Sequence, residues 1–213
     1  DLMLSISGLS KSFNRRKVLN NLSLEIKTGE TAIFMGNNGA GKTTLLRIIA
    51  KIMTPDSGKI IFENNNILKG LPSSRKNILY IGHSPGMYAS LSALENLKFA
   101  LEIRNNLLSE NKIKYELERF GLLEQMNDPI SFYSQGMLQR LKLTYAELSN
   151  WNLLLLDEPF SGLDKSSEDQ IDLVLKNWKN NGKTICLVLH SLDKAKIFGD
   201  IFFRLEEGRA NKV

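Results

Sequence analysis

The segment from Gly36 to Thr43 has the composition that most directly indicates chemistry. It reads G-N-N-G-A-G-K-T and fits the pattern G-x-x-x-x-G-K-[ST], between a strand pattern at 31–35 and a helical pattern at 44–52. Glycines let backbone N–H groups approach phosphate oxygens, and the helix that follows turns its partial positive end toward the same anion. We therefore expect a phosphate-binding loop here rather than an ordinary glycine-rich turn with an exposed lysine.

The side chains at the end of this segment have separate expected contributions. Lys42 would neutralise β- and γ-phosphate oxygens, and the Thr43 hydroxyl would be a ligand of Mg²⁺. The other residues expected to contact the bound phosphates are Gly36, Asn37, Asn38, Gly39, Ala40, Gly41 and Thr44. The segment predicts nucleotide binding together with Mg²⁺.

Two adjacent carboxylates, Asp157 and Glu158, follow an apolar strand pattern at Leu153 to Leu156. Open α/β sheets hold their ligands at the carboxyl ends of such strands. Asp157 would join the metal shell, and Glu158 would orient and deprotonate the water that attacks the γ-phosphate. An Asp-Glu pair after a strand is by itself more often a solvated turn, but a phosphate loop in the same chain favours the catalytic interpretation.

The elements that position these residues follow from hydrophobic periodicity. Apolar runs such as Leu153 to Leu156 are typical of strands covered on both faces, whereas Leu22, Leu24 and Ile26 alternate with polar residues, as in a half-exposed strand. This combination predicts an α/β sheet with an added antiparallel piece. The expected strands are Leu2–Ile6, Leu22–Ile26, Thr31–Met35, Lys59–Phe62, Ile78–Ile81, Leu153–Leu156 and Thr184–Leu189.

Between residues 84 and 150 the strand patterns give way to helical spacing, with Leu94, Leu97 and Leu101 on one stripe. We expect one domain, 1–213, in which 1–83 and 151–213 form a nucleotide-binding core and 84–150 a helical subdomain. Helix boundaries are also predicted. Capping boxes are expected at Ser92 with Glu95 and at Ser166 with Asp169, and helix ends near Gly121 and Gly182.

Composition excludes several classes of protein. With 213 residues, 42% of them hydrophobic, the chain can bury an ordinary core, which argues against disorder. Its apolar runs fall short of the roughly 20 residues of a membrane-spanning helix, and no secretory signal opens it, so we expect a soluble, cytoplasmic protein. The single cysteine, Cys186, predicts a buried apolar residue rather than a redox or zinc site. A net charge of +5 fits phosphate ligands, an anionic membrane or nucleic acid without choosing among them.

Taken together, these residues resemble the nucleotide-binding subunit of an ATP-binding cassette (ABC) transporter, over nearly the whole chain. Tyr133 to Met137 stands where that family has its L-S-G-G-Q signature, of which Ser134 and Gly136 remain. In the family this signature opens a helix whose N-terminus faces the γ-phosphate held by the other subunit. The stretch taken alone would also fit a serine-capped core helix.

The resemblance extends to three further residues. Phe13 matches the aromatic residue that stacks on adenine, although a core phenylalanine is the alternative. Asp164 in Ser161-Gly162-Leu163-Asp164 matches the family's D-loop at the subunit contact, and His190 matches the switch histidine that contacts the γ-phosphate.

One position departs from the family. After the strand at Ile78–Ile81, where a glutamine usually contacts Mg²⁺ and the attacking water, this chain has His83 and then Ser84. Imidazole is shorter and titrates near neutral pH, so we assign His83 to the sensing loop without a defined ligand role. The run from Gly82 to Gly86 is similar to ATPases of the haem exporter that serves cytochrome c maturation.

The resemblance implies a P-loop NTPase core sheet with an antiparallel β subdomain and a helical subdomain. It also implies ATP and Mg²⁺ as cofactors, an ATP-sandwich dimer with a second copy, and a separate membrane-spanning permease at the cytoplasmic face of the inner membrane. Three alternatives remain: a soluble ABC ATPase acting on nucleic acid or the ribosome, a transporter ATPase for another cargo, and a phosphate-binding protein without turnover. No nucleic acid partner is expected, because the chain has one cassette and no coiled-coil or zinc insertion.

Overall fold

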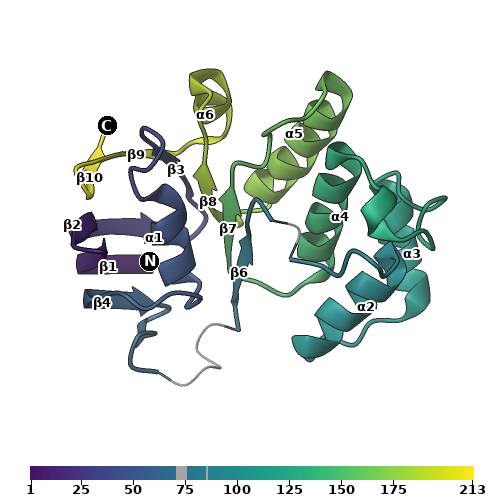
Figure 1. Ribbon diagram of the computed structural model, residues 1–213, viewed down its shortest axis with the longest axis horizontal. Coiled ribbons are helices and arrows are strands. Elements are labelled where there is room, and N and C mark those ends of the chain that lie inside the picture. The colour runs from purple at the N-terminus through teal and green to yellow at the C-terminus, as the bar shows by residue number, and fades with distance from the viewer. Residues whose placement is uncertain (71–75, 85) are drawn as a thin grey trace. The chain divides into compact units, whose positions relative to one another are not determined.

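A computed structural model describes residues 1–70, 76–84 and 86–213 (Figure 1). Pro85, within the run that is similar to haem exporter ATPases, lies outside the described residues. The elements are β1 (Leu2–Phe13), β2 (Arg16–Lys27), β3 (Thr31–Met35), α1 (Lys42–Ile49), β4 (Ser57–Phe62), β5 (Asn65–Asn66), β6 (Ile78–Ile81), α2 (Ala93–Ile103), α3 (Glu110–Arg119), the 3-10 turn η2 (Ile130–Phe132), α4 (Gln135–Leu148), β7 (Leu153–Asp157), α5 (Lys165–Asn180), β8 (Thr184–Val188), α6 (Leu192–Phe198), β9 (Ile201–Glu206) and β10 (Arg209–Lys212).

The larger sheet has the strand order β10-β9-β3-β8-β7-β6. All neighbours pair in parallel except β10, which pairs antiparallel with β9 at one edge. Every residue of β7 and β8 is buried, as their continuous apolar sequences predict. Because the strands are parallel, their carboxyl ends lie at one edge of the sheet, and β3, β7 and β8 each lead there into a candidate site residue.

The smaller sheet is antiparallel, with the order β2-β1-β4-β5. Together the two sheets confirm the expected α/β fold with an antiparallel addition. β1 and β2 are longer than the sequence analysis predicted, because their pairing continues to Phe13 opposite Arg16. Asn14 and Arg15 form the turn between them with positive φ angles of 46° and 67°, as in the tight turns that match the twist of a hairpin.

Strands β9 and β10 were not among the strands expected from the sequence. In β9, Ile201, Phe203 and Leu205 are buried, whereas the residues between them are partly or fully exposed. This period of two was readable from the sequence. Its position beside β3, far away in the chain, was not.

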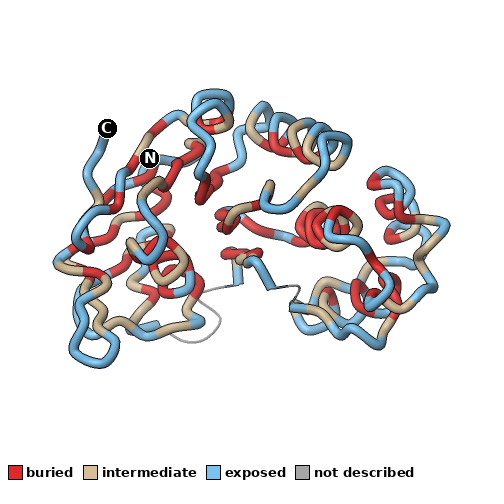
Figure 2. Tube along the Cα trace, turned by 45° about the horizontal axis from the view of Figure 1, so that its top comes forward, coloured by how far each residue is buried: buried red, intermediate tan, exposed pale blue. Residues whose placement is uncertain are grey.

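The described chain divides into two compact units: residues 1–82, 151–158 and 175–213, and residues 83–150 and 159–174. We call them the core unit and the helical unit. Buried residues, red in Figure 2, occur in both. The division expected from the sequence assigns 159–174 to the core. In the structure this segment packs with the signature region instead, because a Cβ on Gly136 would lie 2.4 Å from Ser167 Oγ. That the chain forms a single domain stays a prediction.

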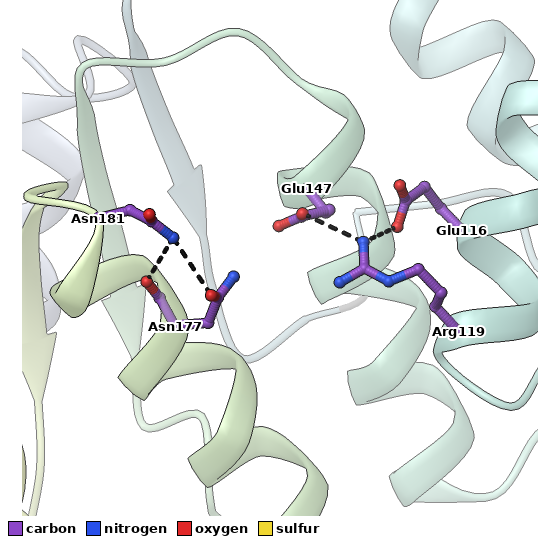
Figure 3. A network of polar contacts seen from close by, with 5 residues as sticks. All are labelled: Glu116, Arg119, Glu147, Asn177 and Asn181. Carbon is purple, nitrogen blue, oxygen red and sulfur yellow. Dashed lines mark hydrogen bonds and ion pairs between the residues drawn. The ribbon is translucent and has the colours of Figure 1, made fainter.

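The helical unit has its own apolar core, in which the expected stripe of Leu94, Leu97 and Leu101 is buried. Ser92 and Glu95 form the predicted capping box of α2. A polar network joins two further helices of this unit (Figure 3): on α3, Arg119 bonds the buried Glu116 at 2.5 Å, and it reaches Glu147 on α4 at 3.4 Å. Figure 3 also draws Asn181 at the end of α5, which bonds the carbonyl of Asn177 at 2.9 Å.

The second predicted capping box is wrong. α5 begins at Lys165, so Ser166 lies inside the helix, and Asp164 caps it instead by accepting a hydrogen bond from the Ser167 backbone N–H at 2.9 Å. Gly182, with a φ of 68°, follows the end of α5 as predicted. Cys186 is fully buried, and burial raises the pKa of its thiol, which agrees with an inert apolar role. No helix of the described residues is long and apolar enough to cross a membrane.

Candidate functional site

The loop between β3 and α1 is shaped by glycines that no other residue could replace without strain. A Cβ on Gly36, whose φ is 147°, would lie 2.5 Å from the carbonyl oxygen of Leu205. Gly41 has a φ of 99° and occupies the N-cap of α1, where no side chain bonds the first turn and no acidic residue follows. The first N–H groups of α1 are therefore left for an external acceptor, which is the arrangement expected of an anion site.

Lys42 is buried at the start of α1, and its ammonium group is turned back onto the loop. Nζ donates to the carbonyl oxygens of Gly36 at 2.6 Å and Asn37 at 3.0 Å. Burial lowers the pKa of Lys42, while the Glu158 and Asp157 carboxylates act in the opposite direction. The lysine thus links the loop electrostatically to the ends of the sheet strands.

Asp157, at the end of β7, is buried beside Thr43. The Thr43 hydroxyl donates to Asp157 Oδ2 at 2.7 Å, and the Tyr80 hydroxyl approaches the same oxygen at 3.5 Å. Within the described residues, nothing donates to Asp157 Oδ1, although that oxygen is buried. An unpaired buried carboxylate oxygen is costly unless a cation takes it, so Asp157 and Thr43 together fit a divalent cation with oxygen ligands.

Glu158 and His190 are brought into contact by the neighbouring strands β7 and β8. Glu158 Oε1 lies 2.7 Å from His190 Nε2, and both side chains remain accessible to solvent. The Glu158 backbone adopts a φ of 53°, which is uncommon for a residue with a side chain, and its N–H bonds the Val188 carbonyl at 3.1 Å. Strain of this kind gathers at functional sites, where the fold holds a side chain in a required direction.

A hollow of about 550 Å³ opens beside the loop in the core unit. The residues that line it include Phe13, Gly41, Lys42, Thr43 and Glu158. Phe13 is 41% exposed, so the alternative that it is a core residue is wrong. Lys11 Nζ lies 5.4 Å from the centre of the Phe13 ring and 3.4 Å from Asp56. The hollow therefore offers an aromatic ring, a cation with the phosphate loop, and a carboxylate in one place.

The candidate residues of the helical unit use their polar groups inside that unit. Ser134 is the N-cap of α4 and accepts a hydrogen bond from the Met137 N–H at 3.2 Å, which also fits the capped-helix alternative. Gly136 is buried against Ser167, and Asp164 caps α5. Hydrogen bonds from Ser167 lower the pKa of Asp164. The structure thus places Ser134, Gly136 and Asp164 in one connected region of this unit.

His83 and Ser84 are exposed, and the backbone at His83 is held from within the helical unit. Lys142 on α4 is buried and donates to the His83 carbonyl oxygen at 2.9 Å. Burial lowers the pKa of Lys142. The structure therefore defines how the His83 backbone is anchored, while the contribution of its imidazole stays a prediction.

Residues 19–161 match the family described as ABC transporter. This chain belongs to that family. Within it, the chain is an ABC transporter ATPase subunit, as the phosphate loop and the paired carboxylates predict.

Three relatives illustrate its place in the family. It is 33% identical over 210 residues to the lantibiotic transport ATP-binding protein SrtF of Streptococcus pyogenes, covering 97% of this chain and 88% of that one. It is 34% identical over 188 residues to the cytochrome c biogenesis ATP-binding export protein CcmA of Vibrio vulnificus (strain YJ016), covering 88% and 92%. A dimeric post-hydrolysis structure of the ATP-binding cassette MJ0796 with ADP and Pi superposes with a TM-score of 0.89 at 25% identity, covering 99% and 98%.

Three residues that contact or line the candidate site were not predicted from the sequence. The contact of Tyr80 with Asp157 was not expected, because nothing in the pattern at β6 distinguishes a tyrosine that faces the neighbouring strand's end. Lys142 was also missed, although a lysine on the buried face of a predicted amphipathic helix is a readable signal. Arg16 lines the same hollow as Phe13, which only the β1–β2 register reveals.

Proposed function

We propose that this ABC transporter ATPase subunit dimerises with a second copy around two Mg²⁺-ATP and powers a separate membrane-spanning permease. It would work peripherally, at the cytoplasmic face of the inner membrane. The observation that carries the proposal is the pairing of Thr43 with Asp157, whose second carboxylate oxygen is buried and unpaired, next to a loop shaped for phosphates. Single-domain 1–213 would act as one cassette, with 84–150 as its helical signature subdomain.

The polyphosphate would be held mainly by the loop itself. The N–H groups at the start of α1 and the Lys42 ammonium would contact the β- and γ-phosphates, and Thr43 with Asp157 would hold Mg²⁺. Bound there, the ion would neutralise charge on the transferring phosphoryl group. Phe13 would stack on the base at the other end of the hollow, where its ring is exposed.

Glu158 is the best-placed base for the attacking water. Its backbone has a φ of 53°, and Oε1 lies 2.7 Å from His190 Nε2, a contact that restricts rotation of the carboxylate. Glu158 would take the proton from water, while His190 would orient that carboxylate and contact the γ-phosphate. A carboxylate and an imidazole placed together in this way also argue against a binding protein without turnover.

The second copy would complete each site through the helical unit. Ser134 and Gly136 open α4, so the helix N-terminus would face the γ-phosphate held by the other copy, with Asp164 near the contact. Removing that phosphate would release the two copies, and the helical unit would transmit the opening to a permease helix docked near the loop after His83. Lys142 would keep that loop attached to α4 during the movement.

A Glu158→Gln variant tests the proposal. We expect it to bind ATP at least as tightly as the native chain, to hydrolyse it more than about 100-fold more slowly, and to accumulate as an ATP-bound dimer. Radiolabelled phosphate release and light scattering measure the two properties. Glu118→Gln, which removes an exposed carboxylate on α3, is the matched control and should behave like the native chain. Native-rate hydrolysis by Glu158→Gln would sink the base assignment.

For the cargo, we propose haem or a related compound exported for cytochrome c biogenesis. The support is the run from Gly82 to Gly86 and the likeness to CcmA, a cytochrome c biogenesis export protein. The likeness to SrtF, a lantibiotic transport protein, favours a peptide cargo instead. Purifying the chain with its permease and reconstituting both in liposomes would distinguish them: haem, and not a lantibiotic peptide, should stimulate ATP hydrolysis and move across the bilayer.

A further inference from the structure

The turn that joins β1 to β2 brings a second cation to the nucleotide hollow. Phe13 and Arg16 are direct partners across the hairpin, and both line the hollow of about 550 Å³. Side chains of directly opposed strand residues stand on the same face, with Cβ atoms about 5 Å apart. The Arg16 side chain therefore starts from the strand position beside the residue whose ring would hold the base.

The other cations at this end are already engaged or lie elsewhere. Lys11 bonds Asp56 and covers the Phe13 ring, and Lys42 donates to two loop carbonyls. Arg15 and Lys17 are not among the lining residues of this hollow. In contrast, no hydrogen bond or ion pair is found for the side chain of Arg16 within the described residues, and that side chain is exposed.

The position of Arg16 defines which part of a nucleotide it would meet. Phe13 marks the base end, and Lys42 with Thr43 marks the end of the β- and γ-phosphates. Arg16 is the cross-strand partner of Phe13, and it lines two hollows together with Asn38 and Gly39 of the phosphate loop, so it belongs both to the base end and to the loop. An anionic oxygen is a better partner for a guanidinium than neutral ribose hydroxyls, because charge-assisted hydrogen bonds are stronger.

From this geometry we infer that Arg16 binds the α-phosphate of the nucleotide and is a second cationic anchor beside Lys42. The inference rests on the proposed nucleotide site. Since ATP, ADP and GTP all carry this phosphate, Arg16 contributes equally to their binding and does not select the base. Because it binds substrate and transition state alike, its loss raises KM and leaves kcat unchanged.

A competing role for Arg16 exists in a neighbouring hollow of about 870 Å³, which it also lines, together with Glu206 and Glu207. In that role Arg16 would pair with an acidic side chain of the β9–β10 hairpin. Its removal would then lower thermal stability and leave nucleotide affinity unchanged. The two roles make opposite predictions for binding.

The test compares Arg16→Ala, Arg16→Lys and Lys17→Ala for their affinity toward ATP, ADP and GTP by titration calorimetry. Arg16→Ala should weaken all three by the same factor, about three- to tenfold as for one partly exposed charged contact, with kcat unchanged. Arg16→Lys should restore part of the loss, because it keeps the charge but not the fork of donors. Lys17→Ala, a neighbour outside the nucleotide hollow, should bind like the native chain.

Each other outcome overturns the inference. Equal losses in Arg16→Ala and Lys17→Ala would indicate a general field effect, and a changed ratio of ATP to GTP affinity would assign Arg16 to the base. Native nucleotide affinity of Arg16→Ala would favour the competing role, in which Arg16 pairs with an acidic side chain of the β9–β10 hairpin. Lys42→Ala separates this inference from the proposed function: native ATP affinity in Lys42→Ala would contradict the nucleotide site itself, whatever Arg16 does.

Discussion

The core unit and the helical unit treat their candidate residues in opposite ways. In the core unit, Asp157 has a buried oxygen with no donor among the described residues, and Glu158 has a positive φ that is uncommon for residues other than glycine. In the helical unit, Ser134 and Asp164 each accept a hydrogen bond as helix N-caps, and Gly136 is packed against Ser167. Among the described residues, the core site therefore retains a buried oxygen without a hydrogen-bond donor, whereas the candidate residues of the helical unit have partners.

This difference indicates what each unit requires. Unpaired buried oxygens and strain cost stability, and folds retain them where a ligand restores the balance. The core unit is therefore built to bind a charged ligand directly. The candidate residues of the helical unit have hydrogen-bonding or packing partners within it, so under the proposed function they would act through surfaces and helix ends that a second copy could meet. Variants of the candidate residues in the core unit should lose activity without losing stability. Variants in the helical unit should lose stability as well as activity.

The largest separation is expected for Asp157→Asn. The change removes a buried charge, keeps an acceptor for the Thr43 hydroxyl, and should preserve or raise the free energy of unfolding, by up to about 1 kcal/mol. Hydrolysis should fall more than about 100-fold, and ATP binding should lose its dependence on Mg²⁺. Chemical denaturation and calorimetry with and without Mg²⁺ measure these effects.

Asp193→Asn is the matched control, because Asp193 is an exposed carboxylate of the core unit in the first turn of α6. It should leave hydrolysis and Mg²⁺ dependence unchanged. If Asp157→Asn lowers the free energy of unfolding by several kcal/mol, the unpaired oxygen of Asp157 does not destabilise the native chain. The proposed difference between the two units would then be wrong.

A smaller effect on activity is expected for Gly136→Ala in the helical unit. The new Cβ would lie 2.4 Å from Ser167 Oγ and displace it, and hydrogen bonds from Ser167 hold the pKa of Asp164 below its usual value. We expect the pKa of Asp164 to rise toward its ordinary value, ATP binding to one chain to stay native, and hydrolysis to fall about tenfold through weaker dimerisation.

Measurements of the Asp164 pKa by NMR, together with ATP affinity, test this prediction. Ser167→Ala is the companion variant, because it removes the same hydroxyl without adding a side chain at Gly136. It should raise the Asp164 pKa and leave the backbone at Gly136 without a steric clash. A loss of ATP affinity in Gly136→Ala equal to its loss of hydrolysis would place Gly136 in the nucleotide pocket of its own chain.

The two regions also differ in how far the sequence predicts them. Strand β7 and its carboxylates follow from apolar runs that end in charge, and the loop at Gly36 to Thr43 follows from glycine spacing, because both depend on local backbone chemistry. The placement of β9 beside β3, and the contact of Glu158 with His190, come from pairing between distant segments. Such pairings depend on the whole sheet and leave little local signal.

The helical unit was harder to predict because its signals compete locally. Ser166 and Asp169 have the spacing of a capping box, but Asp164, two residues before Ser166, makes the cap, since a carboxylate at the N-cap is as effective as a serine hydroxyl. Lys142 lies on the buried face of a helix that the sequence predicts, so its burial was readable, but its partner, the distant His83 carbonyl, was not.

The smallest effect, and the sharpest contrast within the helical unit, is expected for Ser134→Ala against Ser109→Ala. Both serines are N-caps whose hydroxyls accept one backbone hydrogen bond, Ser134 from Met137 and Ser109 from Lys112. Each change should therefore lower the free energy of unfolding by about 1 kcal/mol. Only Ser134 opens the helix that would face the nucleotide of a second copy, so only Ser134→Ala should also weaken the ATP-dependent dimer, as measured by analytical ultracentrifugation. Equal weakening of the dimer by both variants would mean that Ser134 acts through stability alone.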